Sequence, residues 1–140
     1  MRILLDTNVL MDFIVNRGPF TDDAEQVIEL CMEEDLECSI AAHTIPNLFY
    51  ILKSHLSLQE RRDVLLKICN MFRVVGIDSE KLESSLKNIE FTDFEDCLQY
   101  ECALDFNADY ILTRNSKDFL HSTIPTIDPK ALIEKLRKSE

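Results

Sequence analysis

The sequence predicts an α/β protein, a three-layer α/β/α sandwich around a central parallel sheet of about five strands. Short apolar runs alternate with segments of helical periodicity along the 140 residues. This alternation is typical of parallel strands joined by helices on both faces. The chain is 46% hydrophobic and 29% charged, and it has only 2 Gly and 4 Pro. That composition indicates a globular chain without a long linker, so we expect one domain over residues 1–140.

Strands are expected where short apolar runs lack helical periodicity. Ile3-Leu4-Leu5 is entirely apolar, as is typical of a strand that is buried on both faces. The predicted strands cover residues 3–5, 38–42, 73–77, 110–112 and 126–127. The last of these is short and is expected at an edge of the sheet.

Helices are expected where apolar residues recur at intervals of three and four residues. Residues 21–35 have this pattern. Pro46 predicts the first turn of a helix that continues to residue 56, because proline is tolerated only there. Asp128 followed by Pro129 predicts the cap and first residue of the last helix. Further helices are predicted over residues 58–72, 79–88 and 92–106.

The cysteines and the apolar segments limit the class of protein. The 5 cysteines are odd in number and include no C-x-x-C pair, which argues against a disulfide framework and a zinc knuckle and favours buried thiols. No apolar run approaches the ~20 residues needed to cross a bilayer. The N-terminus does not resemble a signal peptide. We therefore expect a cytoplasmic protein without a membrane partner.

The net charge of −11 bears on the choice of partner. Proteins that hold nucleic acid through phosphate contacts are usually basic. Either nucleic acid is not the partner, or a bound divalent cation or a basic partner protein supplies positive charge. The acidic excess can also serve solubility alone.

Oxygen-bearing side chains follow the predicted strands, where parallel sheets bind ligands. They stand after the first strand, in the helices that follow residues 42 and 91, and after the strand 110–112: Asp6, Asn8, Asn47, Asp93, Asp96, Thr113, Arg114, Asn115 and Asp118. Clustered carboxylates raise one another's pKa, and a divalent cation removes that penalty. Oxygen ligands of this kind suit Mg²⁺.

Most of these residues also have a structural interpretation. Thr92 and Glu95 fit a capping box. Asp93 and Asp96 in a first helical turn gain about 0.3–1 kcal/mol each from the helix dipole. Asp118 can cap a helix or face solvent. Asp6 is harder to explain structurally, because a carboxylate directly after a buried strand costs free energy unless it is paired or bound to metal.

Three stretches together resemble the PIN-domain family, the fold of VapC-type toxin ribonucleases and of distant flap-endonuclease relatives. LLDTNVLMDF resembles the opening motif, with Asp6 as its first acidic residue. DCLQYECAL resembles the central helix motif, with Asp96 as the third acidic residue. YILTRNSKDF resembles the closing motif. The order and spacing of the three motifs extend the resemblance over essentially the whole chain.

Two positions depart from the family pattern. Asn47 stands where the family usually has a glutamate, and Asn115 stands where it often has an aspartate. Asp93 and Asp118 lie close in sequence to the expected acidic positions and are candidates to supply the missing charge. The stretch DFEDCLQY also resembles a PIN subgroup described as nucleic-acid-binding, so the amides are consistent with a subgroup feature.

The resemblance implies hydrolysis of phosphodiester bonds in RNA, assisted by Mg²⁺ or Mn²⁺. Asp6 and Asp96, with Asp93 or Asp118, would hold one or two cations. A second set would orient water or substrate: Asn8, Asn47, Thr113, Arg114 and Asn115. Arg114 could either contact phosphate or neutralise a neighbouring carboxylate.

Other interpretations remain open. A PIN domain that has lost catalysis would serve as a binding module for nucleic acid or protein. A toxin would be paired with a basic antitoxin. A receiver domain would need an acidic pair after its first strand, and a haloacid-dehalogenase-like phosphatase would need D-x-D, which Asp6-Thr7-Asn8 does not supply. The segment 48–56 could form a homodimer contact or belong to the core.

The two amides lead to a prediction about metal affinity. Because Asn47 and Asn115 present no formal charge to a cation, we expect weak binding that depends on millimolar Mg²⁺ or on Mn²⁺. Isothermal titration calorimetry measures this affinity directly. Tight, micromolar binding of Mg²⁺ would contradict the prediction.

Overall fold

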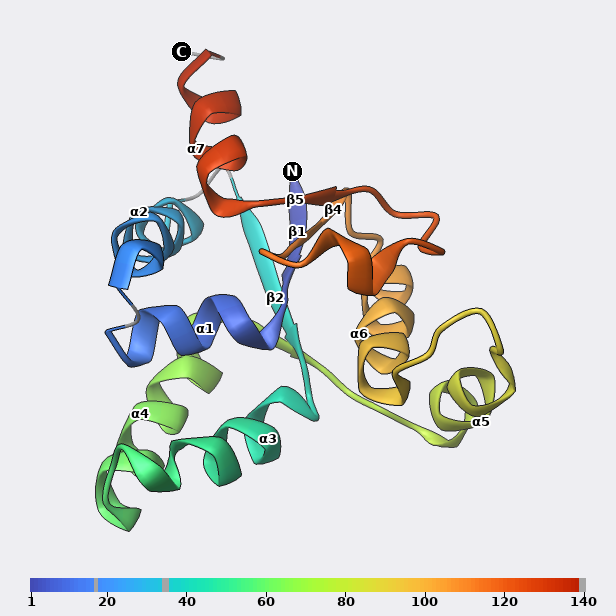
Figure 1. Cartoon of the computed structure of the whole chain (residues 1–140), viewed down its shortest axis with the longest axis horizontal. Coiled ribbons are helices and arrows are strands. Elements are labelled where there is room, and N and C mark those ends of the chain that lie inside the picture. Colours follow the sequence, from blue (N-terminus) through green and yellow to red (C-terminus); the bar gives the residue numbers. More distant parts are fainter. Residues whose placement is uncertain (17, 34–35, 139–140) are drawn as a thin grey trace.

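The central sheet has five parallel strands with β1 in the middle. The computed structural model describes residues 1–16, 18–33 and 36–138 (Figure 1). The strands pair in the order β3-β2-β1-β4-β5, and every pair is parallel. Their bounds are β1 Arg2–Leu5, β2 Glu37–Ala41, β3 Arg73–Val75, β4 Tyr110–Leu112 and β5 Thr126–Ile127. The predicted α/β class and the parallel five-stranded sheet are confirmed.

Helices cover both faces of this sheet, as expected for a three-layer sandwich. Figure 1 shows α1, α2, α3, α4 and α7 on one side and α6, with α5 packed against it, on the other. The α-helices are α1 Thr7–Ile14, α2 Thr21–Cys31, α3 Thr44–Ile51, α4 Leu58–Met71, α5 Ser79–Lys87, α6 Phe94–Asp105 and α7 Pro129–Lys138. Short 3₁₀ turns cover Gly18–Phe20, Leu52–Ser54 and Ser116–Phe119.

The central strand supplies side chains to both layers of the core. Ile3 and Leu5 are fully buried in the cluster that also holds Leu132 of α7. Leu4 is fully buried in the opposite cluster, where it joins Tyr100 of α6. Successive side chains of a strand point to opposite faces, so this apolar run can be buried on both sides.

The predicted boundaries hold to within a few residues, with four differences. The helix predicted over 21–35 ends at Cys31, and residues 34–35 lie outside the described part of the chain. The helix predicted from Pro46 to residue 56 spans Thr44–Ile51 instead, and its Leu48 belongs to the core. The third strand ends at Val75. Helix α1 was not predicted, because it begins directly after β1 and has only eight residues.

The structure shows the state of the cysteine thiols and whether any described helix could cross a membrane. Buried thiols are confirmed for four of the five cysteines, whereas Cys69 is exposed, and all five are free. Within residues 1–16, 18–33 and 36–138, no helix is long and apolar enough to cross a membrane.

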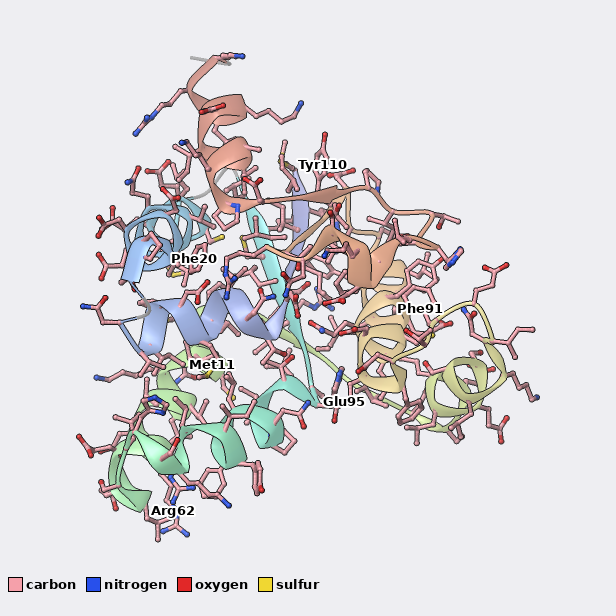
Figure 2. All side chains as sticks on the ribbon, viewed as in Figure 1. Met11, Phe20, Arg62, Phe91, Glu95 and Tyr110 are labelled. Atoms are coloured by element: carbon pink, nitrogen blue, oxygen red, sulfur yellow. The ribbon has the colours of Figure 1, made fainter. Side chains whose placement is uncertain are left out.

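A buried ion pair joins α1 to the loop after β4. Arg114 Nε donates to Asp12 Oδ2 at 2.5 Å, and its Nη2 donates to Oδ1 at 3.2 Å. The Asp12 side chain is only 1% exposed, whereas that of Arg114 is 21% exposed. The guanidinium also lies 4.0 Å from the centre of the Phe20 ring, which Figure 2 labels. Of the two roles expected for Arg114, the structure shows the neutralisation of a neighbouring carboxylate, that of Asp12.

This pair predicts a difference between two carboxylate substitutions. Asp12→Ala should lower the free energy of unfolding by about 3 kcal/mol, because it leaves a partly buried guanidinium unpaired. Asp105→Asn removes the exposed pair with Lys81 and should cost about 1 kcal/mol or less. Urea denaturation followed by circular dichroism measures both values. Equal losses in the two variants would contradict the structural role given to Asp12.

Candidate functional site

Asp6 directly follows the central strand and occupies the N-cap position of α1, but its side chain does not cap that helix. Its backbone N–H donates to the Leu112 carbonyl at 2.9 Å. The carboxylate instead accepts from Gln99 Nε2 at 2.9 Å and from Thr113 Oγ1 at 2.7 Å. The residue is 5% exposed. Asp6 therefore links the carboxyl ends of β1 and β4 to helix α6.

Burial dominates the electrostatics of Asp6. Desolvation raises the pKa of its carboxyl group, and the charge of Asp118 adds to that effect. The hydrogen bonds from Thr113, Gln99 and the backbone of Thr7 act in the opposite direction but do not cancel it. The fold thus holds an acid whose ionised form is disfavoured until positive charge reaches it.

Asp96 lies in the first turn of α6, behind a cap formed by Asp93. The Asp93 carboxylate accepts from the Asp96 backbone N–H at 2.9 Å. The capping box expected from Thr92 and Glu95 is therefore wrong, because Asp93 is the N-cap. Burial, followed by the charges of Asp93, Asp118, Asp6 and Glu95, raises the pKa of Asp96 to about 7.

A cavity of about 240 Å³ opens beside these two carboxylates. Met11 of α1 and Glu95 of α6 contribute to its walls, and Figure 2 labels both. Five residues that were expected in the site from sequence also line it: Asp6, Asn8, Asn47, Asp96 and Asp118. The structure thus brings together side chains from the first strand end, from α3, from α6 and from the turn after β4.

The four other expected residues do not line this cavity. Thr113 lies behind Asp6 as its hydrogen-bond donor, and the Asn115 N–H donates to Thr113 Oγ1 at 3.0 Å. Arg114 pairs with Asp12, and Asp93 caps α6. Of the two acids proposed to replace missing family carboxylates, Asp118 lies on the cavity and Asp93 does not.

Sequence reasoning missed two residues of the cavity, Gln99 and His43. Gln99 follows Asp96 by three positions, and that spacing places both on the same face of a helix. His43 follows β2 by two residues, so the strand-end rule that found Asp6 could also have found it. Its Nε2 lies 3.0 Å from the Glu95 carbonyl oxygen and donates to it. Burial lowers the pKa of the His43 ring.

The donor chemistry of the cavity fits a divalent cation with few direct protein ligands. Within the described residues, no group of three or more His, Cys, Asp or Glu side chains is arranged to hold a metal ion. The charge of Asp6 nevertheless raises the pKa of Asp96, and the charge of Asp118 raises the pKa of both. Carboxylate and amide oxygens are the ligand types that Mg²⁺ and Mn²⁺ accept. A bound cation would offset these negative charges.

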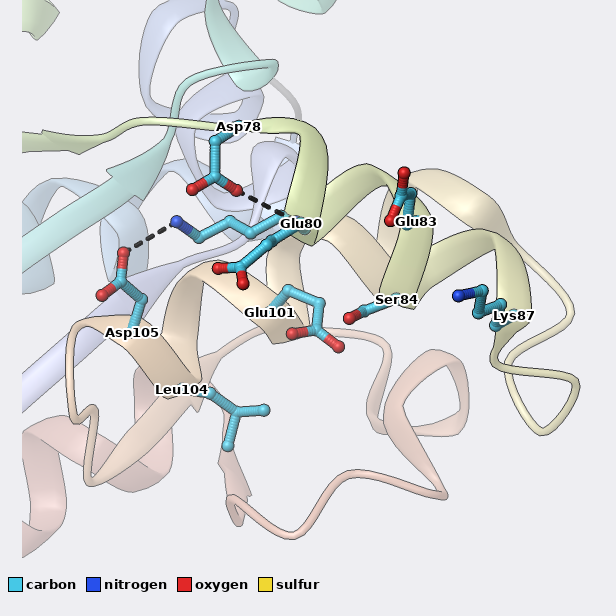
Figure 3. Close-up of a pocket in the computed structure, with 9 residues that line it drawn as sticks. Asp78, Glu80, Glu83, Ser84, Lys87, Glu101, Leu104 and Asp105 are labelled. Atoms are coloured by element: carbon cyan, nitrogen blue, oxygen red, sulfur yellow. Dashed lines mark hydrogen bonds and ion pairs between the residues drawn. The ribbon is translucent and has the colours of Figure 1, made fainter.

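A larger acidic cavity, of about 650 Å³, lies between α5 and α6 (Figure 3). Its carboxylates are Asp78, Glu80, Glu83, Glu101 and Asp105. Four of these five residues are exposed, and Lys81 Nζ lies 2.8 Å from Asp105. Solvent and Lys81 therefore compensate much of this charge, whereas Asp6 is only 5% exposed and burial raises the pKa of both Asp6 and Asp96. We place the functional site at the smaller cavity.

The chain is similar to proteins of known family and structure. The PIN domain family profile matches residues 2–117, and curated protein sequences give no match. VapBC2 from Rickettsia felis, bound to a DNA fragment from its promoter, is 17% identical with a TM-score of 0.70, over 91% of this chain and 98% of that chain. VapBC-1 from nontypeable Haemophilus influenzae is 17% identical with a TM-score of 0.70, over 93% and 99%. A toxin–antitoxin complex from Klebsiella pneumoniae is 25% identical with a TM-score of 0.68, over 91% and 97%.

The raised pKa of Asp96 predicts a pH-dependent stability difference in metal-free buffer. The fold favours the protonated acid, so the stability that this acid contributes is fully present below the usual pKa of 3.8 and is lost as the pH rises to about 7. Asp96→Asn removes the charge. Allowing for solvent screening of a half-buried group, the variant should be about 1–2 kcal/mol more stable than wild type at pH 8.

Urea unfolding in EDTA, at about pH 5 and pH 8, measures this difference. The advantage of Asp96→Asn should be smaller at the lower pH, because the wild-type carboxyl is then largely protonated in the folded state. A stability difference that does not change with pH would contradict the electrostatic account of Asp96.

Proposed function

The chain belongs to the PIN-domain family, and from that membership we propose that it is a metal-dependent endoribonuclease that hydrolyses phosphodiester bonds in single-stranded RNA. The observation that carries the proposal is the meeting of Asp6 and Asp96 in one cavity, each with a raised pKa. They come from distant parts of the chain and face a charge penalty that a cation would remove.

Asp6 and Asp96, with Asp118, are the residues we propose to hold Mg²⁺ or Mn²⁺. The charge of Asp118 raises the pKa of both Asp6 and Asp96, which supports its place beside them. Asp93 is the weaker candidate, because its carboxylate caps α6. When bound, the cation would lower the pKa of a water nucleophile and stabilise the charge that develops on the phosphate.

The remaining residues of the site would position these carboxylates, water or substrate. Gln99 and Thr113 fix both oxygens of Asp6 by direct hydrogen bonds. Asn8 and Asn47 line the cavity and present amide groups that can orient a water molecule or an RNA hydroxyl. We assign Arg114 to structure rather than to phosphate binding, because it pairs with Asp12.

We also propose that the protein is the toxin of a toxin–antitoxin pair. The solved structures with similar folds include VapBC proteins and a toxin–antitoxin complex. The net charge of −11 suits a basic partner protein and disfavours direct RNA binding without a cation. Homodimer formation, proposed from the segment 48–56, would have to use its exposed residues such as Tyr50, since Leu48 and Leu52 are fully buried.

A second candidate function is a PIN domain that binds nucleic acid or protein without cleaving it. Asn47 lies on the cavity at the position where the family usually has a glutamate. Within the described residues, no three-ligand group of acidic, His or Cys side chains is present. Both observations favour a site with reduced metal affinity. Binding of RNA without cleavage would be its signature.

Cleavage of a labelled single-stranded RNA distinguishes the two functions. Wild type in Mn²⁺ should cut the RNA, EDTA should abolish the reaction, and Asp96→Asn should lower the rate by about 100-fold or more. Asp105→Asn is the matched control, because it removes the same charge from the same helix outside the cavity. It should cleave like wild type.

All variants must be purified side by side, so that contaminating ribonuclease becomes visible as activity common to every sample. Cleavage by Asp96→Asn at the wild-type rate would refute the enzymatic proposal. Retained RNA binding in the absence of any cleavage would support the binding module instead.

A further inference from the structure

Three buried side-chain atoms that can accept hydrogen bonds, in residues that line the cavity, have no partner among the described residues. Among the residues that the structure describes, five buried side-chain nitrogen or oxygen atoms lack a hydrogen bond, and three of them belong to residues that line this cavity. They are Gln99 Oε1, His43 Nδ1 and Asn8 Oδ1. A buried acceptor without a donor costs free energy. The presence of three such atoms in residues of one cavity therefore indicates a ligand that donates hydrogen bonds.

The orientation of the Gln99 amide follows from its neighbour. Gln99 is 3% exposed, and its Nε2 lies 2.9 Å from Asp6 Oδ1. With a cation bound, Asp6 is ionised and only accepts hydrogen bonds, so the NH₂ group then faces Asp6. The Oε1 atom is thereby left as a buried acceptor without a donor, on a residue that lines the cavity.

The same reasoning settles the tautomer of His43. Its Nε2 lies 3.0 Å from the Glu95 carbonyl oxygen, which can only accept. Nε2 therefore carries the hydrogen, and Nδ1 has a free lone pair. Because Glu95 precedes Asp96, the bond also ties the start of α3 to the first turn of α6.

A ligand of this cavity must supply both positive charge and hydrogen-bond donors. The carboxylates of Asp6 and Asp96 require positive charge, and the neutral acceptors require N–H or O–H donors. A bare cation supplies only the first, whereas a hydrated cation supplies both. Mg²⁺ gives up water reluctantly and usually keeps several waters. The volume of about 240 Å³ can hold a cation with several waters, each of which occupies about 30 Å³.

We propose that Gln99 and His43 bind the water shell of a hydrated divalent cation, so that this site recognises the cation largely through its waters. This inference rests on the proposed function, because the cation is the one that Asp6 and Asp96 would attract. Direct contact is limited to the carboxylates proposed above, those of Asp6, Asp96 and Asp118. Gln99 and His43 are positioning residues that contact water rather than metal.

Hexaamminecobalt(III) is the probe for this mode of binding. Its ammonia ligands donate hydrogen bonds and do not exchange, so it can bind only as an intact shell. Electron paramagnetic resonance of free Mn²⁺ gives the amount bound to the protein. Hexaamminecobalt(III) should displace Mn²⁺ from one site per wild-type chain.

Two substitutions of His43 separate its acceptor from its structural bond. His43→Gln keeps a donor that can reach the Glu95 carbonyl but lacks the Nδ1 acceptor, and it should weaken hexaamminecobalt(III) binding about 10-fold. His43→Asn places an amide near the Nδ1 position but loses the bond to Glu95. It should bind the probe more tightly than His43→Gln does.

Gln99→Leu removes the second acceptor and should also weaken binding about 10-fold. Circular dichroism checks that it folds, and the His43 pair keeps the test valid if it does not. Glu101→Gln is the charge control: Glu101 lies on the same helix but lines the cavity between α5 and α6 (Figure 3). Its binding should match that of wild type.

Several results would overturn the proposal. Mn²⁺ binding that hexaamminecobalt(III) fails to displace, or wild-type affinity in both His43→Gln and Gln99→Leu, would show that the site does not recognise the cation through its waters. Displacement of Mn²⁺ by arginine amide but not by hexaamminecobalt(III) would assign the acceptors to a basic partner protein. If RNA cleavage survives these results, only this inference fails. If wild type binds no Mn²⁺, the metal-dependent function fails as well.

Discussion

The buried carboxylate of Asp6 is the constraint on which the rest of the site depends. It directly follows the central strand, and its two oxygens accept hydrogen bonds from Gln99 of α6 and from Thr113, which follows β4. Moving an anion out of water costs several kcal/mol unless it is compensated, and the two neutral donors compensate it only in part. The negative charge of Asp6, at the centre of the carboxyl edge of the sheet, is therefore incompletely compensated and would be stabilised by a cation.

The strand order brings further side chains of the site close to Asp6. Because β1 lies between β2 and β4, the chain segments that follow these strands converge on Asp6. His43 arrives from one side and Asp118 from the other, and α6 adds Asp96 from above the sheet. The charges of Asp6 and Asp118 raise the pKa of Asp96, and the charge of Asp118 also raises the pKa of Asp6. Gln99 and His43 add neutral hydrogen-bond acceptors to the lining residues. Such acceptors can bind the water ligands of a hydrated cation.

The sequence predicts the parts of this arrangement that depend on local pattern. Apolar runs locate the strands, and the strand-end rule finds Asp6 and Asp118. Local sequence pattern cannot predict contacts between residues that are far apart in the chain, because these contacts depend on tertiary packing. Gln99 meets Asp6 across 93 positions, His43 meets Glu95 across 52, and Arg114 meets Asp12 across 102. The choice between Asp93 and Asp118 was open for the same reason, since either spacing was compatible with the motif.

The most direct test of the account is the position of bound Mn²⁺ in crystals of the wild-type protein, read from its anomalous scattering. The account predicts a peak in the cavity lined by Asp6 and Asp96, and no peak there in crystals of Asp96→Asn. A peak confined to the acidic cavity between α5 and α6, or no ordered Mn²⁺ at millimolar concentration, would contradict the claim that the buried carboxylates form a cation site.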